Sequence, residues 1–157
     1  MKKVDDYKVK PNNLRKILDP EFLKTNNPNQ ELLGVTDEIL GAYYYAAVQL
    51  LEEKNWMDAR DAFRFLTFLN PCMHDFWVGL GISEQAQEKF QDAFKSYVVA
   101  IETDPADPVA HANAFQCCKA LGDNAIADEE LKKAVECCGN EPKFSELKGK
   151  LQQYNKQ

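Results

Sequence analysis

The chain has 157 residues, of which 45% are hydrophobic and 28% are charged, a composition that suits one folded domain and excludes intrinsic disorder. Nineteen Lys and Arg residues against 25 Asp and Glu residues leave a formal net charge of −6, which argues against nucleic acid as a partner. No apolar leader follows the charged start, and no run reaches the roughly 18 to 20 uncharged residues that cross a bilayer. We therefore expect a cytoplasmic protein without direct membrane insertion.

Residues 1–35 are predicted to form an N-terminal arm. A short amphipathic segment, broken near Asp19-Pro20, carries its apolar residues at helical spacing: Leu14, Ile17, Leu18, Phe22 and Leu23. The polar residues 25–30 that follow predict a loop. Because this segment is too short for a core of its own, we expect it to dock on the rest of the chain or on a second copy, which makes it a candidate dimerisation segment.

An internal repeat with a period of 34 residues occupies the middle of the chain. Its clearest columns are Tyr43, Trp77 and His111, then Ala59, Ala93 and Ala127, then Phe63, Tyr97 and Leu131, and finally Pro71, Pro105 and Gly139. This pattern resembles the tetratricopeptide repeat (TPR). Small residues let two antiparallel helices approach closely, and the large residues fill the space beside them, so each unit is predicted to be a helical hairpin.

The repeat region is predicted to span 36–139, with units at about 40–73, 74–107 and 108–139. Its six helices are expected at about 37–53, 56–69, 74–88, 90–103, 108–122 and 124–138. Thr36 and Asp107 are the expected N-caps, Pro108 suits a first helical position, and Gly122 suits a helix end.

Residues 140–157 are predicted to contain a capping helix near 141–154. Its apolar residues, spaced along one face, are Phe144, Leu147, Leu151 and Tyr154. Such a helix would cover the apolar face that the last repeat of a solenoid leaves open. The expected fold is therefore all-α, a right-handed superhelix of three TPR hairpins with an N-terminal arm and a C-terminal capping helix.

The first helices of stacked hairpins line the concave side, where repeat proteins often bind extended chains. The second, fifth, ninth and twelfth positions of each unit are expected to face inward. The fifth, ninth and twelfth of these positions nominate as peptide-binding residues Tyr44, Val48, Leu51, Val78, Ile82, Gln85, Ala112, Gln116 and Lys119. The first two units then supply mostly apolar pockets, whereas Gln116 and Lys119 suit hydrogen bonds to a peptide backbone.

Core packing is the alternative for these residues. Successive helical residues diverge by about 100°, so Tyr43, Tyr44 and Tyr45 cannot share a face, and the period favours Tyr44 for the groove. If the groove assignment holds, replacing Tyr44 and Ile82 is expected to abolish peptide binding and to affect the fold much less.

Three stretches resemble a narrower family, the class II chaperones of type III secretion. They are the helix entry at 35–46, the block Trp56-Met57-Asp58-Ala59-Arg60 with residues 62–66, and the run Phe76-Trp77-Val78-Gly79-Leu80-Gly81. The resemblance covers about residues 33–138 and implies a non-enzymatic chaperone of the bacterial cytoplasm. It also implies a translocator protein as client, bound through an extended segment of the Pro-x-Leu-x-x-Pro type, and a homodimer. Tyr44 matches a groove tyrosine of that family.

Catalytic, metal and cofactor sites are not expected. The spacing of His74 and His111 implies no Ser or Asp partner for a catalytic triad, and His111 is expected to pack in the repeat column of Trp77. The adjacent pairs Cys117-Cys118 and Cys137-Cys138 diverge on a helix and are expected to be reduced and buried rather than to bind zinc. The alternative function is a generic TPR scaffold or cochaperone that binds another protein's C-terminal peptide, which requires cationic and amide side chains on the concave face.

Overall fold

The computed structural model describes residues 28–154, and within that range it contains helices and no strand. Six helices form the repeat region: α3 (Asp37–Glu52), α4 (Trp56–Leu69), α5 (His74–Ala86), α6 (Phe90–Thr103), α7 (Pro108–Leu121) and α8 (Asn124–Cys138). The short helix α2 (Pro28–Leu32) precedes them, and a 3-10 turn (Pro142–Phe144) and α9 (Ser145–Tyr154) follow. None of these helices is long and apolar enough to span a membrane.

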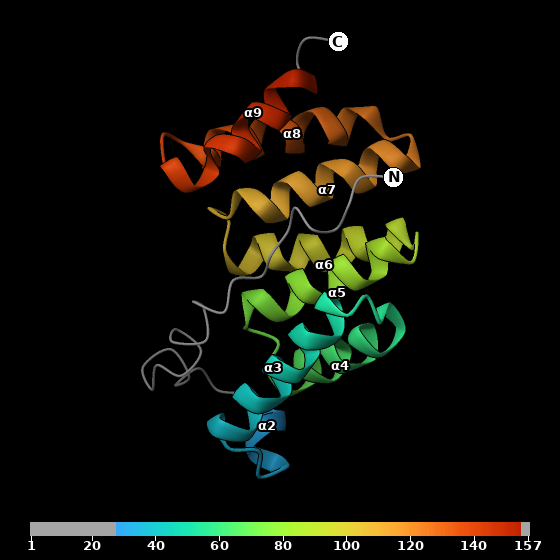
Figure 1. Ribbon diagram of the computed structural model, residues 1–157, viewed down its shortest axis with the longest axis vertical. Helices are drawn as coiled ribbons and strands as arrows, with labels where there is room; N and C mark the ends of the chain where they lie inside the picture. Colours follow the sequence, from blue (N-terminus) through green and yellow to red (C-terminus); the bar gives the residue numbers. More distant parts are fainter. Residues whose placement is uncertain (1–27, 155–157) are drawn as a thin grey trace.

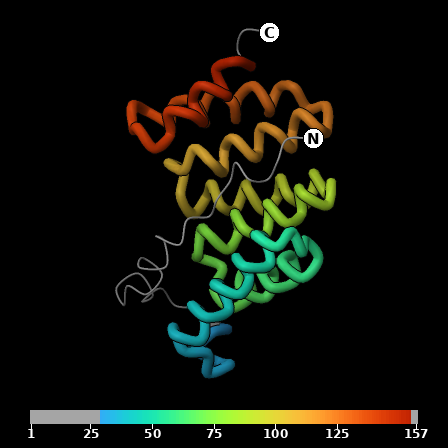
Figure 2. The backbone as a smooth tube through the Cα atoms, in the orientation of Figure 1, coloured from blue at the N-terminus to red at the C-terminus, as the bar shows by residue number. Residues whose placement is uncertain are grey.

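Consecutive helices pack in antiparallel pairs, and the pairs stack along the long axis of the molecule (Figures 1 and 2). Helix α3 also contacts α5, and α5 contacts α7, so the first helices of the three hairpins form one continuous layer. Helices α4, α6 and α8 are the second members of the pairs. The expected all-α superhelix of three hairpins is confirmed.

The helix ends follow local chemistry. The Thr36 hydroxyl oxygen accepts from the Ile39 amide at 3.3 Å, and the Asp107 carboxylate accepts from the amides of Val109 and Ala110. Gly122 ends α7 with φ +81°, a conformation that glycine adopts without steric cost. The bounds predicted for the second helices are confirmed, whereas α3 ends one residue and α5 two residues earlier than predicted.

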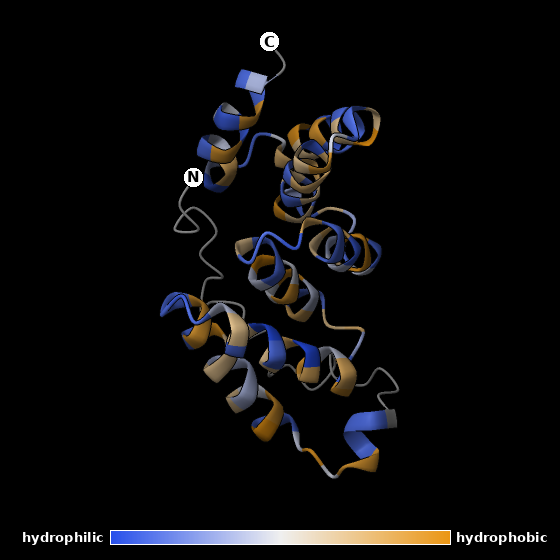
Figure 3. Ribbon diagram, turned by 90° about the vertical axis from the view of Figure 1, so that its right-hand side faces the viewer, coloured by the Kyte–Doolittle hydropathy of each residue, from blue (hydrophilic) through white to orange (hydrophobic). Residues whose placement is uncertain are grey.

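The repeat columns form the core because small residues sit against aromatic rings. Ala59 and Ala93 are fully buried, and so are the aromatic side chains of Phe63 and Tyr97 one turn further along. The ring of Phe63 lies against the backbone of Gly79, and the ring of Tyr97 lies against that of Gly81. Helices α4 and α6 are amphipathic, with a buried stripe along one face, whereas α5 and α7 are buried around most of their circumference. Figure 3 shows hydrophobic and hydrophilic residues along these helices.

At the N-terminal end the sequence prediction is partly wrong. The loop expected at 25–30 overlaps α2, which begins at Pro28. Two amides hold this helix in place: Asn29 donates to the Phe68 carbonyl and Gln30 to the Asp37 carboxylate, each at 2.8 Å. Polar residues read as a loop therefore act as helix anchors. The amphipathic segment predicted from Leu14 to Leu23 lies outside the described residues.

At the C-terminal end the expected capping helix is present. Leu151 is buried against α7 and α8, with three partly buried apolar neighbours on the same segment, which are Phe144, Leu147 and Tyr154. The segment begins as a 3-10 turn at Pro142–Phe144 rather than as α-helix. This arrangement covers the end of the last hairpin, as a solenoid requires.

The close approach at Gly81 gives a stability prediction. A Cβ atom at this position would lie 2.6 Å from Cε1 of the buried Tyr97 ring. We expect Gly81→Ala to lower the free energy of unfolding by about 1–3 kcal/mol, despite the better helix propensity of alanine. Urea denaturation measures the change.

Gly149→Ala is the matched control, because a Cβ there meets nothing within 4 Å and the residue lies in a helix. We expect this variant to gain up to about 1 kcal/mol. Equal stability of the two variants would contradict the packing described for Gly81.

Candidate functional site

The nine predicted peptide-binding residues all lie on the first helices. Helix α3 carries Tyr44, Val48 and Leu51, α5 carries Val78, Ile82 and Gln85, and α7 carries Ala112, Gln116 and Lys119. Because these helices contact one another, the residues fall along one layer of the molecule. Their assignment to a peptide site remains a prediction.

The apolar members of this set lie deeper than expected. Six of them belong to the hydrophobic cores: Tyr44, Val48, Leu51, Val78, Ile82 and Ala112. The Tyr44 ring packs against two aromatic rings, with centroid distances of 6.1 Å to Phe63 and 5.4 Å to Phe76. A ligand would therefore cover a shallow apolar floor rather than enter open pockets around these side chains.

This burial changes the mutational test. Tyr44 is 2% exposed and Ile82 is 5% exposed, so their replacement is expected to destabilise the fold as well as to affect binding. Truncating a buried aromatic residue typically costs about 3–5 kcal/mol, and an unpaired carboxylate at a buried position adds to that cost. If such a double variant lost peptide binding, the loss could result either from unfolding or from the missing side-chain contacts, so the experiment would not locate the site.

The three consecutive tyrosines of α3 diverge, as the helical period requires. Tyr43 and Tyr45 are 46% and 51% exposed, whereas Tyr44 turns inward. The Tyr44 hydroxyl is buried and has no hydrogen-bond partner within the described residues. Burial, with a smaller contribution from Asp75, raises the pKa of this phenol well above its ordinary value. Tyr44 is therefore a neutral core residue with an unsatisfied polar group.

Two glutamines join the second and third hairpins within this layer. The Gln85 side chain donates from Nε2 to Oε1 of Gln116 at 3.1 Å, and the Tyr97 hydroxyl donates to Oε1 of Gln85 at 2.8 Å. Both glutamines are half-buried, so their amides remain partly accessible, and Lys119, the third polar residue of the set, is exposed. An extended peptide has the backbone groups to compete for such amides.

Lys119 lies where the layer meets the C-terminal helix. Its Nζ is 4.8 Å from the ring centroid of Tyr154 and 5.8 Å from that of Phe115, and the two rings pack edge to face. Cation–π attraction thus orients the lysine toward α9. Sequence spacing does not indicate this arrangement, because it assigns Tyr154 only to the capping of the core.

Sequence analysis also missed a polar pocket that α4, α5 and the start of α6 form. Glu84, which replaces the Tyr usual in the repeat, is buried and accepts from the Ser96 hydroxyl at 2.7 Å. Burial raises the pKa of its carboxyl above the ordinary value. The side chains that line this pocket of about 280 Å³ come from α4 to α6: Arg60, Arg64, Glu84, Lys89, Asp92, Lys95 and Ser96.

The four cysteines of α7 and α8 behave as small apolar residues, whereas Cys72 is exposed. Cys117, Cys118 and Cys138 are buried, and Cys137 is half-buried. Burial raises the pKa of the Cys117 thiol to about 12 and that of Cys118 to about 11, which keeps both protonated. Among the described residues no group of three His, Cys, Asp or Glu side chains is placed to hold a metal ion.

Comparison with known proteins found relatives of similar sequence. It is 28% identical over 126 residues to the low calcium response locus protein H of Yersinia pseudotuberculosis, a match that covers 80% of this chain and 75% of that protein. A match of 67 residues, 31% identical, links it to human tetratricopeptide repeat protein 6 but covers only 13% of that protein. No family model matches the chain.

Solved structures agree with the sequence matches. The type III secretion translocator chaperone SycD of Yersinia enterocolitica superposes with a TM-score of 0.73 at 26% identity, over 80% of this chain and 94% of that one. SycD in complex with a peptide of the translocator YopD gives a TM-score of 0.74 at 27% identity, over 76% and 91% of the two chains. In sequence and in fold, the chain thus resembles the TPR chaperones of type III secretion translocators, and the resemblance expected from its sequence is confirmed.

Proposed function

We propose that the chain is a type III secretion chaperone that binds translocator proteins along the layer formed by α3, α5 and α7. In this role it acts in the bacterial cytoplasm, without catalysis, and keeps its clients soluble and competent for secretion. The observation that carries the proposal is the likeness to SycD, which was solved with a translocator peptide and whose chain is matched over 91% of its length.

The groove chemistry fits an extended segment of the Pro-x-Leu-x-x-Pro type. The apolar floor of α3 and α5 suits proline and leucine side chains, and the amides of Gln85 and Gln116 suit the peptide backbone. Burial of apolar surface contributes roughly 25 cal/mol per Å², and ordering the peptide offsets part of it. A dissociation constant in the micromolar range, about 8 kcal/mol of binding free energy, is the expected scale for a short peptide.

The generic scaffold is the second candidate, and the geometry disfavours it. Capture of a C-terminal carboxylate needs a cluster of cationic and amide side chains. Of the nine candidate residues only Lys119 is cationic, and it lies over the rings of Phe115 and Tyr154. The apolar floor has no role in binding a carboxylate.

We also propose a homodimer formed through the first hairpin. All but two of the large exposed apolar side chains of the described range lie on or beside α2, α3 and α4. Those that frame one end of this region are Leu32, Leu33, Ile39, Tyr43, Phe65 and Phe68, and we call them the first-hairpin patch. The rings of Tyr43 and Phe65 touch, with centroids 5.9 Å apart. An apolar patch of this kind marks an interaction site, and SycD has been solved in a form described as an alternative dimer.

Site-specific photo-crosslinking tests the client site without truncating core residues. A benzophenone amino acid at half-buried Gln116 on α7 is expected to crosslink a translocator peptide of the Pro-x-Leu-x-x-Pro type, because Gln116 lies in the proposed binding layer. Gel analysis and mass spectrometry of the product give the yield and the attachment point.

The matched control carries the same probe at Lys95 on α6, whose side chain is 69% exposed. We expect little product there and loss of the Gln116 product with excess unlabelled peptide. Equal or greater crosslinking at Lys95 would place the client on the other side of the molecule.

Light scattering tests the dimer. Phe68 is 55% exposed, so Phe68→Glu is expected to change stability by no more than about 0.5 kcal/mol while placing a charge in the proposed contact. We expect the variant to have half the mass of the wild type. Met57→Glu, at the other end of α4 and 63% exposed, is the control and should keep the wild-type mass. A dimeric Phe68→Glu variant would exclude the first-hairpin patch as the contact.

A further inference from the structure

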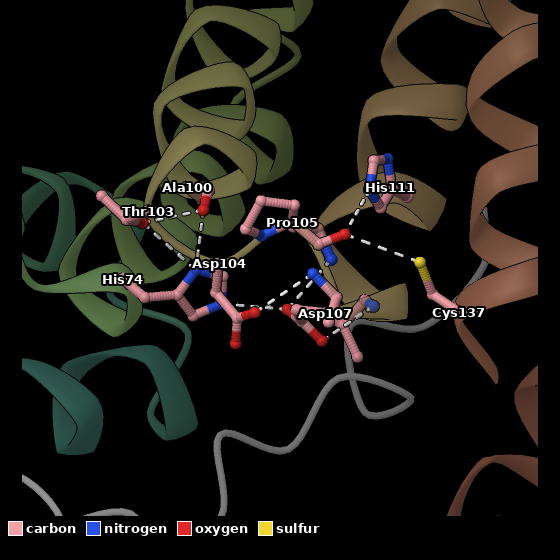
Figure 4. A network of polar contacts seen from close by, with 11 residues as sticks. His74, Ala100, Thr103, Asp104, Pro105, Asp107, His111 and Cys137 are labelled. Carbon is pink, nitrogen blue, oxygen red and sulfur yellow. Dashed lines mark hydrogen bonds and ion pairs between the residues drawn. The ribbon is translucent and has the colours of Figure 1, made fainter. Parts of the chain in front are cut away.

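The loop between α6 and α7, residues 104–107, connects the second hairpin to the third. Both histidines of the chain bind to this junction, one from each side (Figure 4). His74 is the first residue of α5, and His111 lies in the first turn of α7. No part of the proposed client site uses either histidine.

His74 links the end of α6 to the start of α7. Its Nδ1 lies 2.9 Å from the Ala100 carbonyl oxygen, and its Nε2 lies 3.0 Å from a carboxylate oxygen of Asp107. The same carboxylate accepts from the amides of Val109 and Ala110, so it also caps α7. The two side chains are only 17% and 18% exposed. One imidazole thus couples three helices.

His111 makes the corresponding link on the other side of the loop. Its Nδ1 lies 2.6 Å from a carboxylate oxygen of Glu130 on α8, and its Nε2 lies 3.1 Å from the Pro105 carbonyl oxygen. The Cys137 thiol is 3.6 Å from the same carbonyl. His111 and Glu130 are both buried, so solvent does not replace these bonds easily.

The proton count at each histidine decides its state. A neutral imidazole has one donor and one acceptor nitrogen, whereas an imidazolium has two donors. Each histidine here faces a carbonyl and a carboxylate, and neither of these groups donates. The Thr103 hydroxyl, 3.5 Å from Nδ1 of His74, donates its proton to the Ala100 carbonyl oxygen at 2.8 Å and so does not donate to the ring. Only the doubly protonated ring satisfies both contacts, because in a neutral ring one nitrogen lone pair would point at an oxygen lone pair.

We propose that His74 and His111 form a pH-sensitive clamp across the junction between the second and third hairpins. The clamp is closed while both imidazoles carry two protons, and it loosens when either ring loses one. Loss of a proton at His74 weakens the contact between α5 and the start of α7, and loss at His111 weakens the contact of the loop with α8.

The surrounding charges favour the closed form. Around His74, Asp107 and Asp75 are acidic, α6 contributes only the Ala100 carbonyl and the Thr103 hydroxyl, and Asp104 in the loop accepts from the Ala106 amide. Burial opposes the charge on His74, but the hydrogen bond and charge of Asp107 outweigh it and raise the pKa above 6.5.

Around His111, the charged groups come from α8. The hydrogen bond that His111 donates to the Glu130 carboxylate raises the pKa of His111 against the opposing effects of burial and of Lys133. Lys133 itself lies 3.3 Å from Glu130, and it helps to keep that carboxylate ionised. Burial would raise the pKa values of Asp107 and Glu130, but their histidine partners lower both below their ordinary values.

The sign of the pH dependence follows from these shifts. A histidine with a raised pKa in the folded state contributes its full stability below its unfolded value near 6.5, and this contribution is lost as the pH rises through the folded value. The two carboxylates limit the clamp at low pH, because their contribution to stability is lost as the pH falls through their lowered pKa values. The clamp is therefore strongest in weakly acidic solution.

NMR titration of the full chain tests the clamp directly. Without a purification tag that contains histidine, the protein has two histidine Hε1 signals, one for each ring. We expect both to titrate with apparent pKa values above 6.5. Asp107→Asn should lower the value of His74 by about one unit or more and change that of His111 much less, and Glu130→Gln should do the reverse.

Thermal unfolding between about pH 6 and pH 9 provides the second readout. The midpoint of the wild type should fall as the pH rises, and the His74→Gln and His111→Gln variants should each show a smaller fall. Histidine pKa values at or below 6.5 in the wild type would overturn the clamp, and this result does not depend on whether any variant folds. Equal pH profiles for wild type and folded variants would overturn it as well.

Discussion

The close contact between glycine backbone and aromatic ring is the constraint on which the rest of the structure depends. Phe63 reaches the backbone of Gly79, and Tyr97 reaches that of Gly81, because neither position of α5 carries a side chain. These contacts draw α4 and α6 onto α5 from two sides. The first helices are thereby held in register as one layer, and that layer is the surface proposed to bind the client.

The sequence predicted the helices well because their signals are local. The caps at Thr36 and Asp107 and the αL glycine at Gly122 each act within a few residues, and the 34-residue period repeats the same local pattern in three units. Short-range signals did not predict α2. Its polar side chains are anchored by contacts within the fold: Asn29 bonds to Phe68, 39 positions further along the chain, and Gln30 bonds to Asp37, 7 positions further along. Helix propensity alone does not predict contacts of this kind.

The sequence predicted which helices carry the candidate residues but not how deeply those residues are buried. The register of the repeat predicts the direction of each side chain. The burial of that side chain depends on which residues of the neighbouring repeat pack against it. Tyr44 illustrates the difference: its inward direction follows from the period, and its burial follows from Phe76 of the next hairpin. The contacts of Gln85 with Gln116 and of His74 with Asp107 join residues more than 30 positions apart, and no spacing rule pairs them.

The same residues therefore serve the core and the proposed site, and a measurement that leaves them intact is needed. Methyl NMR of the labelled protein, titrated with a translocator peptide of the Pro-x-Leu-x-x-Pro type, provides it. We expect the methyl signals of Val48, Val78 and Ile82 to shift in proportion to bound peptide, while Ile126 on α8, which is outside the layer, stays unchanged. Shifts confined to Ile126 and other residues of the second helices, with Ile82 unaffected, would contradict the central claim that the first-helix layer binds the client.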